Sequence, residues 1–383
     1  MDLRRKPLGV VQNSMILRSM TRYRFDPWED EADRGPFDPD PEAEPDLWFS
    51  PPPEDAAAAT DPPGPDAGHR RLIDPHVWRA AQDRHSGALA DLAALFGALD
   101  ERLHAGPEGW RHRLALLEVA DLGWWTGARV PMDQLALWVG LRRGATGEEA
   151  QELIRAGWAV RRLSGGPGLA GGPGPADGPG PTEGGWQAGL AAFLGRGAPG
   201  AAVPDSVCDM AQILSETGSL HPVTQAAILF HAWRRVAQGA AVDVEAAVLA
   251  ARHGAGAGRG AALFLPLALS GSGALRATGT EQQRLGAWIA GAAQAVLAAL
   301  LHLDRLRDWQ GRARAATAGL SGRTPPALIA ALVDWPMISA PLAEQITGAS
   351  RAAVQRNLDT LAARGLIREV TGQGRFRVWA ARI

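Results

Sequence analysis

Four arginines and one glutamine near the carboxyl end of the chain are the residues best suited to contact a nucleic acid. Arg351, Gln355 and Arg356 fall on one predicted helix, and Arg375 and Arg377 fall on a predicted hairpin that follows it. A guanidinium pairs with phosphate or with the guanine edge, and a glutamine amide pairs with the adenine edge. These residue types, so close together, predict contact with DNA.

The elements that would position these side chains can be predicted from helix caps and stops. A short amphipathic helix over Leu328–Trp335 is followed by Ser339, which can cap a second helix that ends at Gly348. Ser350 can cap a third helix that ends at Gly365. Two helices joined by a short turn with glycine have helix-turn-helix spacing.

A β-hairpin is predicted behind this pair of helices. The stretches LIREV and RFRVWA flank the turn TGQG, which is typical of two short strands. Phe376 and Val378 then share one face of the hairpin, and Arg375 and Arg377 share the other. The whole unit, residues 321–383, is predicted to be a winged helix-turn-helix domain.

A helical wheel separates the inner and outer sides of the third helix. Val354, Leu358 and Leu361 fall on one side and are expected in the core. The opposite side carries small Ala352, which permits close approach, and Asp359, which would repel phosphate, so the first two turns should make the contact. The candidate DNA-binding residues are Ser350, Arg351, Ala352, Gln355, Arg356, Arg375 and Arg377.

The charge of the chain is distributed unevenly. From Ser321 onward there are eight arginines against four Asp plus Glu, so this unit is about +4. The whole chain is near neutral, at −2, because its first seventy residues are strongly acidic. A local patch, and not the bulk charge, must therefore supply any affinity for DNA.

The remaining chain is expected to be a mainly α-helical body. Residues 1–70 are rich in acid and proline and predict a disordered tail. Helical regions are expected over 71–163 and 186–320, separated by a Gly/Pro-rich linker over 164–185, with a buried turn over Ala262–Ser270. The individual helices are predicted at 89–103, 109–125, 131–141, 147–163, 205–217, 221–238, 242–253 and 280–320.

The apolar stretch Leu285–Leu303 has alternative interpretations. It is long enough to span a bilayer, but its alanines, Gln294, His302 and flanking charges favour a buried core helix and no membrane. Because its apolar residues lie on more than one face, it could be buried within the body or could pair two subunits into a homodimer.

Other site chemistry is scarce. A lone cysteine, Cys208, excludes an internal disulfide and fits a reducing, cytoplasmic location. The histidines do not fall at metal-ligand spacing with carboxylates, and Gly254–Gly260 (GAGAGRG) lacks the Gly-Lys-Ser/Thr of a nucleotide loop. We expect no metal and no cofactor.

The carboxyl-terminal run resembles known domains. TPPALIAALVDWPMISAPLAEQITGASRAAVQRNLDTLAARGLIREVTGQGRFRVWAA is similar to the C-terminal helix-turn-helix domain of an α-proteobacterial, largely plasmid-borne family of unknown function. LFLPLA and LHPVTQAAILFHAWR extend that similarity into the body. The resemblance implies a DNA-binding, regulatory protein.

The same run also resembles the winged helix found after Fic domains, which transfer a nucleotide monophosphate to a hydroxyl. That reaction would need His-Pro-Phe-x-x-Gly-Asn-Gly-Arg, and here His221–Pro222 is followed by VTQAAILFHAWR; Thr126 stands in the place of a Glu. We therefore expect no enzyme activity. The alternatives to a DNA-binding regulator are a protein-interaction or scaffold protein and a degenerate Fic-like protein.

The predicted disorder of the tail can be tested by deleting residues 1–70. The thermal transition of the remaining chain should be nearly unchanged, because an acidic, proline-rich segment buries little apolar surface. If the tail competes with DNA for the basic unit, the deletion should also tighten DNA binding, most at low salt. A fall of many degrees in Tm would instead show that Trp48 and its neighbours pack on the body.

Overall fold

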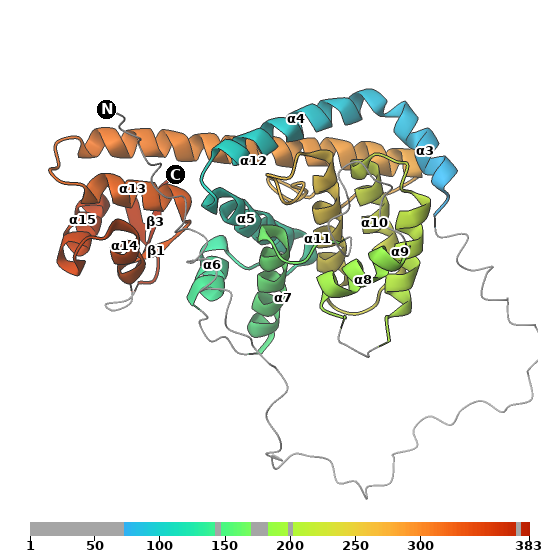
Figure 1. Cartoon of the computed structure of the whole chain (residues 1–383), viewed down its shortest axis with the longest axis horizontal. Coiled ribbons are helices and arrows are strands. Elements are labelled where there is room, and N and C mark those ends of the chain that lie inside the picture. Colours follow the sequence, from blue (N-terminus) through green and yellow to red (C-terminus); the bar gives the residue numbers. More distant parts are fainter. Residues whose placement is uncertain (1–72, 142–146, 170–182, 198–201, 373–376) are drawn as a thin grey trace, which may run out of the picture. The chain divides into compact units, whose positions relative to one another are not determined.

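A computed structural model describes residues 73–141, 147–169, 183–197, 202–372 and 377–383 (Figure 1). The predicted tail and most of the predicted linker lie outside this part of the chain. Within it the protein is mainly helical. The elements are α3 (Pro75–Arg84), α4 (Ser86–Ala105), α5 (Gly109–Thr126), α6 (Met132–Leu141), α7 (Gly147–Ser164), α8 (Glu183–Leu194), α9 (Asp205–Glu216), α10 (Pro222–Val236), α11 (Val242–Gly254), a 3-10 turn (Ala255–Ala257), α12 (Glu281–Thr317), α13 (Thr324–Asp334), β1 (Ile338–Ser339), α14 (Ala340–Thr347), α15 (Arg351–Ala363), β2 (Ile367–Glu369) and β3 (Val378–Ala381).

The individual helices predicted in the body are present to within a few residues. The bounds of α3 and α8 were not predicted, although α3 and most of α8 fall in the regions expected to be helical. Asp74 caps α3 by accepting the His76 N–H, at 2.8 Å, and proline occupies the first turn. Helix α8 begins at Glu183, inside the segment 164–185 that was predicted to lack regular structure. The prediction ended the linker too late because of Gly184 and Gly185. These glycines lie in the first turn of α8, where glycine destabilises a helix less than it does in the interior.

Helix α12 is a central packing element. It contacts α3, α4, α10 and α13, and its inner side chains, such as Trp288, Val296 and Trp309, are buried. By length and composition alone it is also the one described helix that could cross a membrane. Leu297 and Leu301 remain 41% and 56% exposed, so self-burial covers most of its apolar residues but not these two.

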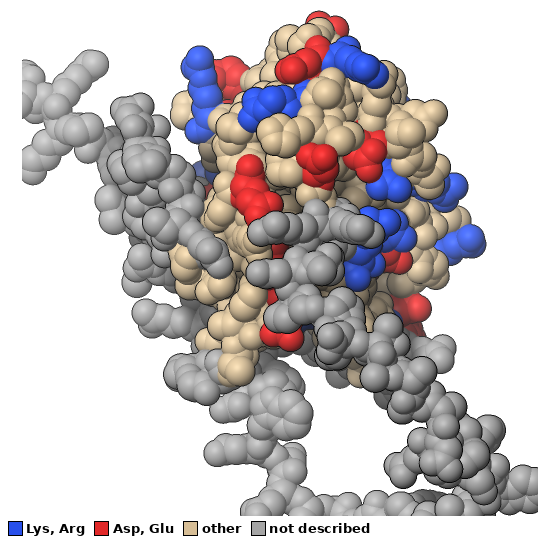
Figure 2. Space-filling model, turned by 90° about the vertical axis from the view of Figure 1, so that its right-hand side faces the viewer, with Lys and Arg blue, Asp and Glu red and all other residues tan. Residues whose placement is uncertain are grey.

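The surface seen from the right-hand side of Figure 1 has no large area of one charge. Figure 2 shows Arg side chains intermingled with Asp and Glu side chains on that face, apart from the residues drawn in grey. This distribution suits a solvated surface, and it offers no extended basic stripe for a nucleic acid.

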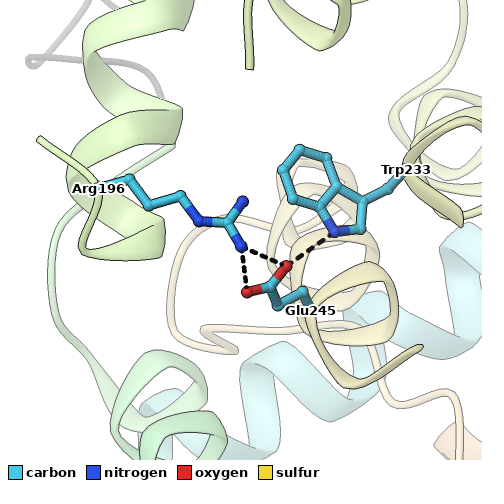
Figure 3. A network of polar contacts seen from close by, with 3 residues as sticks. All are labelled: Arg196, Trp233 and Glu245. Atoms are coloured by element: carbon cyan, nitrogen blue, oxygen red, sulfur yellow. Dashed lines mark hydrogen bonds and ion pairs between the residues drawn. The ribbon is translucent and has the colours of Figure 1, made fainter. Parts of the chain in front are cut away.

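A buried carboxylate joins three parts of the body (Figure 3). The Arg196 guanidinium, just after α8, donates to both oxygens of Glu245 on α11, at 2.8 and 3.0 Å. Trp233 on α10 donates its indole N–H to Glu245 Oε2 at 3.1 Å. Burial raises the pKa of Glu245, and Arg196 and Trp233 oppose that rise. Because Arg196 and Trp233 both donate to the Glu245 carboxylate, burying this charge costs less free energy than burying an unpaired carboxylate would.

The predicted buried turn over Ala262–Ser270 is confirmed, and α5 supplies its hydrogen bonds. Phe264, Leu265 and Leu267 are buried without forming a helix or strand. The Glu118 carboxylate accepts the backbone N–H groups of Leu267, Ala268 and Leu269, at 2.8, 2.8 and 3.1 Å. A buried backbone that cannot use a helix or sheet ladder needs such partners. Glu118 supplies three of them at once.

Buried ionisable groups predict how stability depends on pH. Among the described residues, burial is the main cause that lowers the pKa of four histidines to about 4: His112, His231, His253 and His302. Burial raises the pKa of Glu118 to about 7. A depressed histidine contributes stability that is present above its unfolded pKa of about 6.5 and lost as pH falls toward 4. A carboxyl whose pKa is raised in the folded state has the opposite effect, since its contribution to stability is lost as pH rises through 7.

We therefore expect stability to fall between pH 6.5 and 4.5. The four strongly shifted histidines, each contributing no more than about 1.4 kcal/mol per pH unit, outweigh Glu118 and the less strongly raised carboxyls Asp121, Glu245 and Asp334. Urea-unfolding midpoints measured across this range test the sign. His253→Gln should make the unfolding midpoint less dependent on pH, because it removes one of the histidines with a lowered pKa. Glutamine can still hydrogen-bond the Gln225 amide that His253 contacts. His104→Gln, at an exposed position, is the matched control. A midpoint that rises on acidification would contradict the expectation.

Candidate nucleic-acid interface

The C-terminal unit, residues 321–383, is built from short elements with well-defined ends. Ser339 Oγ accepts the Leu342 N–H at the start of α14, and Gly348 ends that helix with a φ of 63°. Ser350 Oγ accepts the Ala353 N–H at the start of α15, and Gly365 follows that helix with a φ of 68°. Both predicted caps and both predicted glycine stops are confirmed. A left-handed φ explains the choice of glycine at the two stops.

A three-stranded antiparallel sheet adjoins these helices. Its order is β1-β3-β2, with Ile338 opposite Trp379 and Ile367 opposite Ala381. The predicted pairing of two strands is present, and the short extended piece at β1 adds a third. Strand β3 lies in the middle, and its Val378, Trp379 and Ala380 are all buried. The turn between β2 and β3 lies outside the described residues over 373–376.

Helix α15 presents the two faces that the sequence predicted. Val354, Leu358 and Leu361 are no more than 1% exposed and pack into the core. Helix α15 contacts α13, α14 and β2 on that side. Ala352 and Arg356 are exposed on the other side.

Asp359 changes the chemistry of that outer face. Its Oδ1 accepts the side-chain amide of Gln355 at 2.9 Å, one turn away along α15. The Gln355 side chain is half-buried and is therefore held along the helix. Reading an adenine edge with Gln355 would require this hydrogen bond to open. Arg356 has no such restraint in the described part of the chain, which makes it the stronger candidate for base contact.

The other predicted residues have different surroundings. Ser350 uses its hydroxyl as a cap, and Arg351 is exposed and lies 3.8 Å from the Glu344 carboxylate. Arg377 is exposed at the start of β3, and its charge acts on Glu369 across the sheet. Arg375 lies outside the described residues.

Some arginines of the C-terminal unit bind the body. Arg364 donates to the Ala316 carbonyl at the end of α12, and Arg368 forms an ion pair with Asp133 on α6. Trp309 on α12 donates its indole N–H to the Leu366 carbonyl at 2.8 Å. Both arginines are among the eight that give residues 321–383 their formal charge of about +4. The structure shows that both side chains have partners on the body.

Helices α5 and α13 cap one another's ends. The buried Arg113 guanidinium on α5 donates to the carbonyls of Leu332 and Trp335, at 2.9 and 2.7 Å, where α13 ends. Asp334 Oδ1 in turn accepts the Gly109 N–H at the start of α5, at 2.8 Å. Each polar side chain satisfies groups that a helix end leaves unpaired. A Cβ on Gly109 would lie 1.8 Å from the Asp334 carbonyl oxygen, so only glycine fits there.

The two capping side chains also influence one another electrostatically. Burial lowers the pKa of Arg113 to about 10, and the nearby Asp334 carboxylate opposes that shift. Burial likewise raises the pKa of Asp334, while the Gly109 N–H and Arg113 lower it. Arg113 therefore stays charged at neutral pH, with its charge compensated by one carboxylate and two carbonyls. No sequence pattern singled out either residue, although an arginine on the buried side of a predicted helix was the available signal.

The stretch that aligns with the Fic motif forms no anion loop. His221 Nδ1 accepts the Val223 N–H, and residues from Pro222 onward continue as α10 without a break. His221 thus caps the helix, and backbone N–H groups at the Gly-Asn-Gly positions belong to helix interior.

No protein-family model and no curated protein matches this chain.

Replacing Arg113 tests how strongly the two helices depend on one another. Arg113→Met should destabilise the chain by at least about 1–3 kcal/mol, because it leaves the carbonyls of Leu332 and Trp335 without their donor. The free energy of unfolding in urea measures this loss. Arg307→Met, at an exposed position on α12, is the matched control and should change it by less than about 0.5 kcal/mol. Equal effects of the two substitutions would show that the caps do not stabilise the fold.

Proposed function

We propose that the C-terminal unit is a winged helix that binds double-stranded DNA and that the chain acts as a transcriptional regulator. The observation that carries the proposal is the outer face of α15. Arg356 and small Ala352 are exposed there, on the helix that follows the Gly348 turn. The hairpin strands β2 and β3 lie on the core side of the unit and leave that face open to a partner.

The dimensions and chemistry of α15 suit the major groove. A helix with its side chains is about 10–12 Å across and fits a groove about 12 Å wide. Ala352 lets the first turn approach the bases closely. Arg356, one turn further, can donate two hydrogen bonds to a guanine edge. Arg351 near the start of the helix and Arg377 beside the sheet are placed for phosphate contact.

We expect charge attraction to phosphate to contribute moderately to the DNA affinity. Of the eight arginines in residues 321–383, Arg364 and Arg368 bind the body. Few phosphates would therefore be neutralised by each copy, and binding should show a shallow dependence on salt. Specific base contact has to supply a correspondingly larger share of the affinity.

One observation favours a second candidate, a protein-interaction module. Asp359 is exposed on the same face of α15 and is held in place by the Gln355 amide. A fixed carboxylate repels phosphate and attracts a cationic side chain of a protein partner. The Asp359 position is three residues beyond Arg356, so DNA contact must be confined to the first two turns.

Single substitutions separate base contacts from phosphate contacts. With a DNA site selected from a random pool, Arg356→Ala should cost about 1–3 kcal/mol of binding free energy on that site and little on random DNA. Gln355→Ala should cost less than Arg356→Ala, since Gln355 must first leave Asp359. Arg351→Ala and Arg377→Ala should weaken all duplexes alike and lower the salt slope by about one unit each.

Fluorescence anisotropy at several salt concentrations measures all four variants, with Arg307→Ala on α12 as the matched control. Unchanged duplex binding in every variant, or the absence of duplex binding at low salt, would reject the DNA-binding proposal and leave the interaction module.

A further inference from the structure

A charged pocket lies in the helical body, away from α15. Its volume is about 360 Å³, and α4, the first turn of α5 and the segment after the 3-10 turn enclose it. The lining residues are Asp100, Glu101, His104, Arg111, Arg259, Gly260 and Ala261. A volume at the lower end of the range for ligand pockets suits a small molecule.

Hydrogen bonds fix the walls of this pocket. The Asp100 carboxylate on α4 accepts the backbone N–H groups of Arg259 and Ala262, at 3.0 and 2.5 Å. From the opposite side, Arg111 Nε on α5 donates to the Ala261 carbonyl at 2.7 Å. Each Asp100 oxygen thus already accepts one backbone N–H group. One backbone N–H of the glycine-rich segment Gly254–Gly260, that of Arg259, is therefore bonded to this carboxylate.

The remaining polar groups are of both signs. The terminal amino groups of Arg111 and the exposed guanidinium of Arg259 are cationic, and Glu101 and His104 are exposed one turn apart on α4. Within the part of the chain that the structure describes, these two arginines and Glu101 form no ion pair. A simple anion would leave Glu101 uncompensated beside it, and a simple amine would face two guanidinium groups.

We propose that this pocket binds a small zwitterion, a free α-amino acid. Its carboxylate would pair with Arg111 and Arg259, whose guanidinium groups offer the paired donors that a carboxylate accepts. Its ammonium group would pair with Glu101. The side chain of the amino acid would extend toward the open side of the pocket, near His104.

The pocket also lies next to the junction that holds the C-terminal unit. Arg111 stands between Gly109 and Arg113, and both of these residues bond the end of α13. A ligand that shifts the Arg111 side chain would therefore also shift the first turn of α5, which is bonded to α13 and through it to the unit that contains α15. This regulatory role rests on the proposed DNA binding, and it makes the amino acid an effector with a coupling of about 5–150-fold in DNA affinity.

Isothermal titration calorimetry on the full chain, without DNA, tests the site itself. The probes are the standard L-amino acids, each at about 10 mM, well above a millimolar Kd. At least one should bind saturably, while propionate and ethylamine, which each carry one of the two charged groups, should not. Binding of propionate as tight as that of the amino acids would overturn the zwitterion proposal. So would the absence of binding by every amino acid.

Variants connect the binding to the pocket. Arg259→Gln and Glu101→Gln, both at exposed positions, should each weaken binding at least about tenfold, as expected for loss of a charged contact. Arg111→Gln should do the same, although it also removes the bond to Ala261. Arg307→Gln is the control and should bind as the unchanged chain does. Binding that survives in Arg259→Gln and Glu101→Gln would overturn the assignment.

A separate measurement distinguishes the two proposals. DNA affinity, measured with and without the bound amino acid, should change by the coupling factor in the unchanged chain and not in Arg259→Gln. If amino acids bind and no duplex does, the pocket stands and the DNA-binding proposal fails. If a duplex binds and no amino acid does, the pocket proposal fails alone. An amino acid that binds without changing DNA affinity would overturn the effector role.

Discussion

The reciprocal capping of α5 and α13 is the interaction on which the arrangement of the described chain depends. Arg113 closes the carboxyl end of α13, and Asp334 closes the amino end of α5. Either helix end would otherwise carry unpaired backbone groups inside the protein. Because each helix caps the other, the C-terminal unit is held to the body through its first helix. Helices α12 and α6 add contacts to the end of α15 and to β2.

In two places in the body, a carboxylate accepts hydrogen bonds from backbone N–H groups that are not in a helix. Glu118 binds three successive N–H groups of the buried segment near Leu267, and Asp100 binds two in the glycine-rich segment. The two accepting carboxylates lie on helices that are consecutive in the sequence, Asp100 on α4 and Glu118 on α5. A mainly helical protein can therefore carry a long irregular connection in its core without leaving polar groups unpaired.

Local patterns in the sequence were sufficient for the helices, the caps and the two faces of α15. Val354, Leu358 and Leu361 repeat at helical spacing, and Ser350 and Gly365 mark the ends, so this information lies within fifteen residues or so of chain. The roles of Arg113, Asp334, Arg364 and Arg368 depend on contacts between distant segments, which no local pattern encodes. Charge counting therefore overestimated the free cations of the C-terminal unit. The start of α8 was missed for a different reason, since Gly184 and Gly185 were included in the predicted glycine- and proline-rich linker. Helix α3 lies in the region predicted to be helical, but its bounds were not predicted.

The pairing of Arg113 with α13 also constrains how the chain is made. Its acceptor carbonyls lie 219 and 222 residues further along the sequence. At a synthesis rate of about 5–20 residues per second, α5 leaves the ribosome roughly 10–40 s before its partners exist. During that interval the guanidinium has no buried acceptors, and α5 cannot pack in its final place without stranding a charge. The start of α5 and the Arg113 side chain therefore acquire these partners only after α13 has been synthesised.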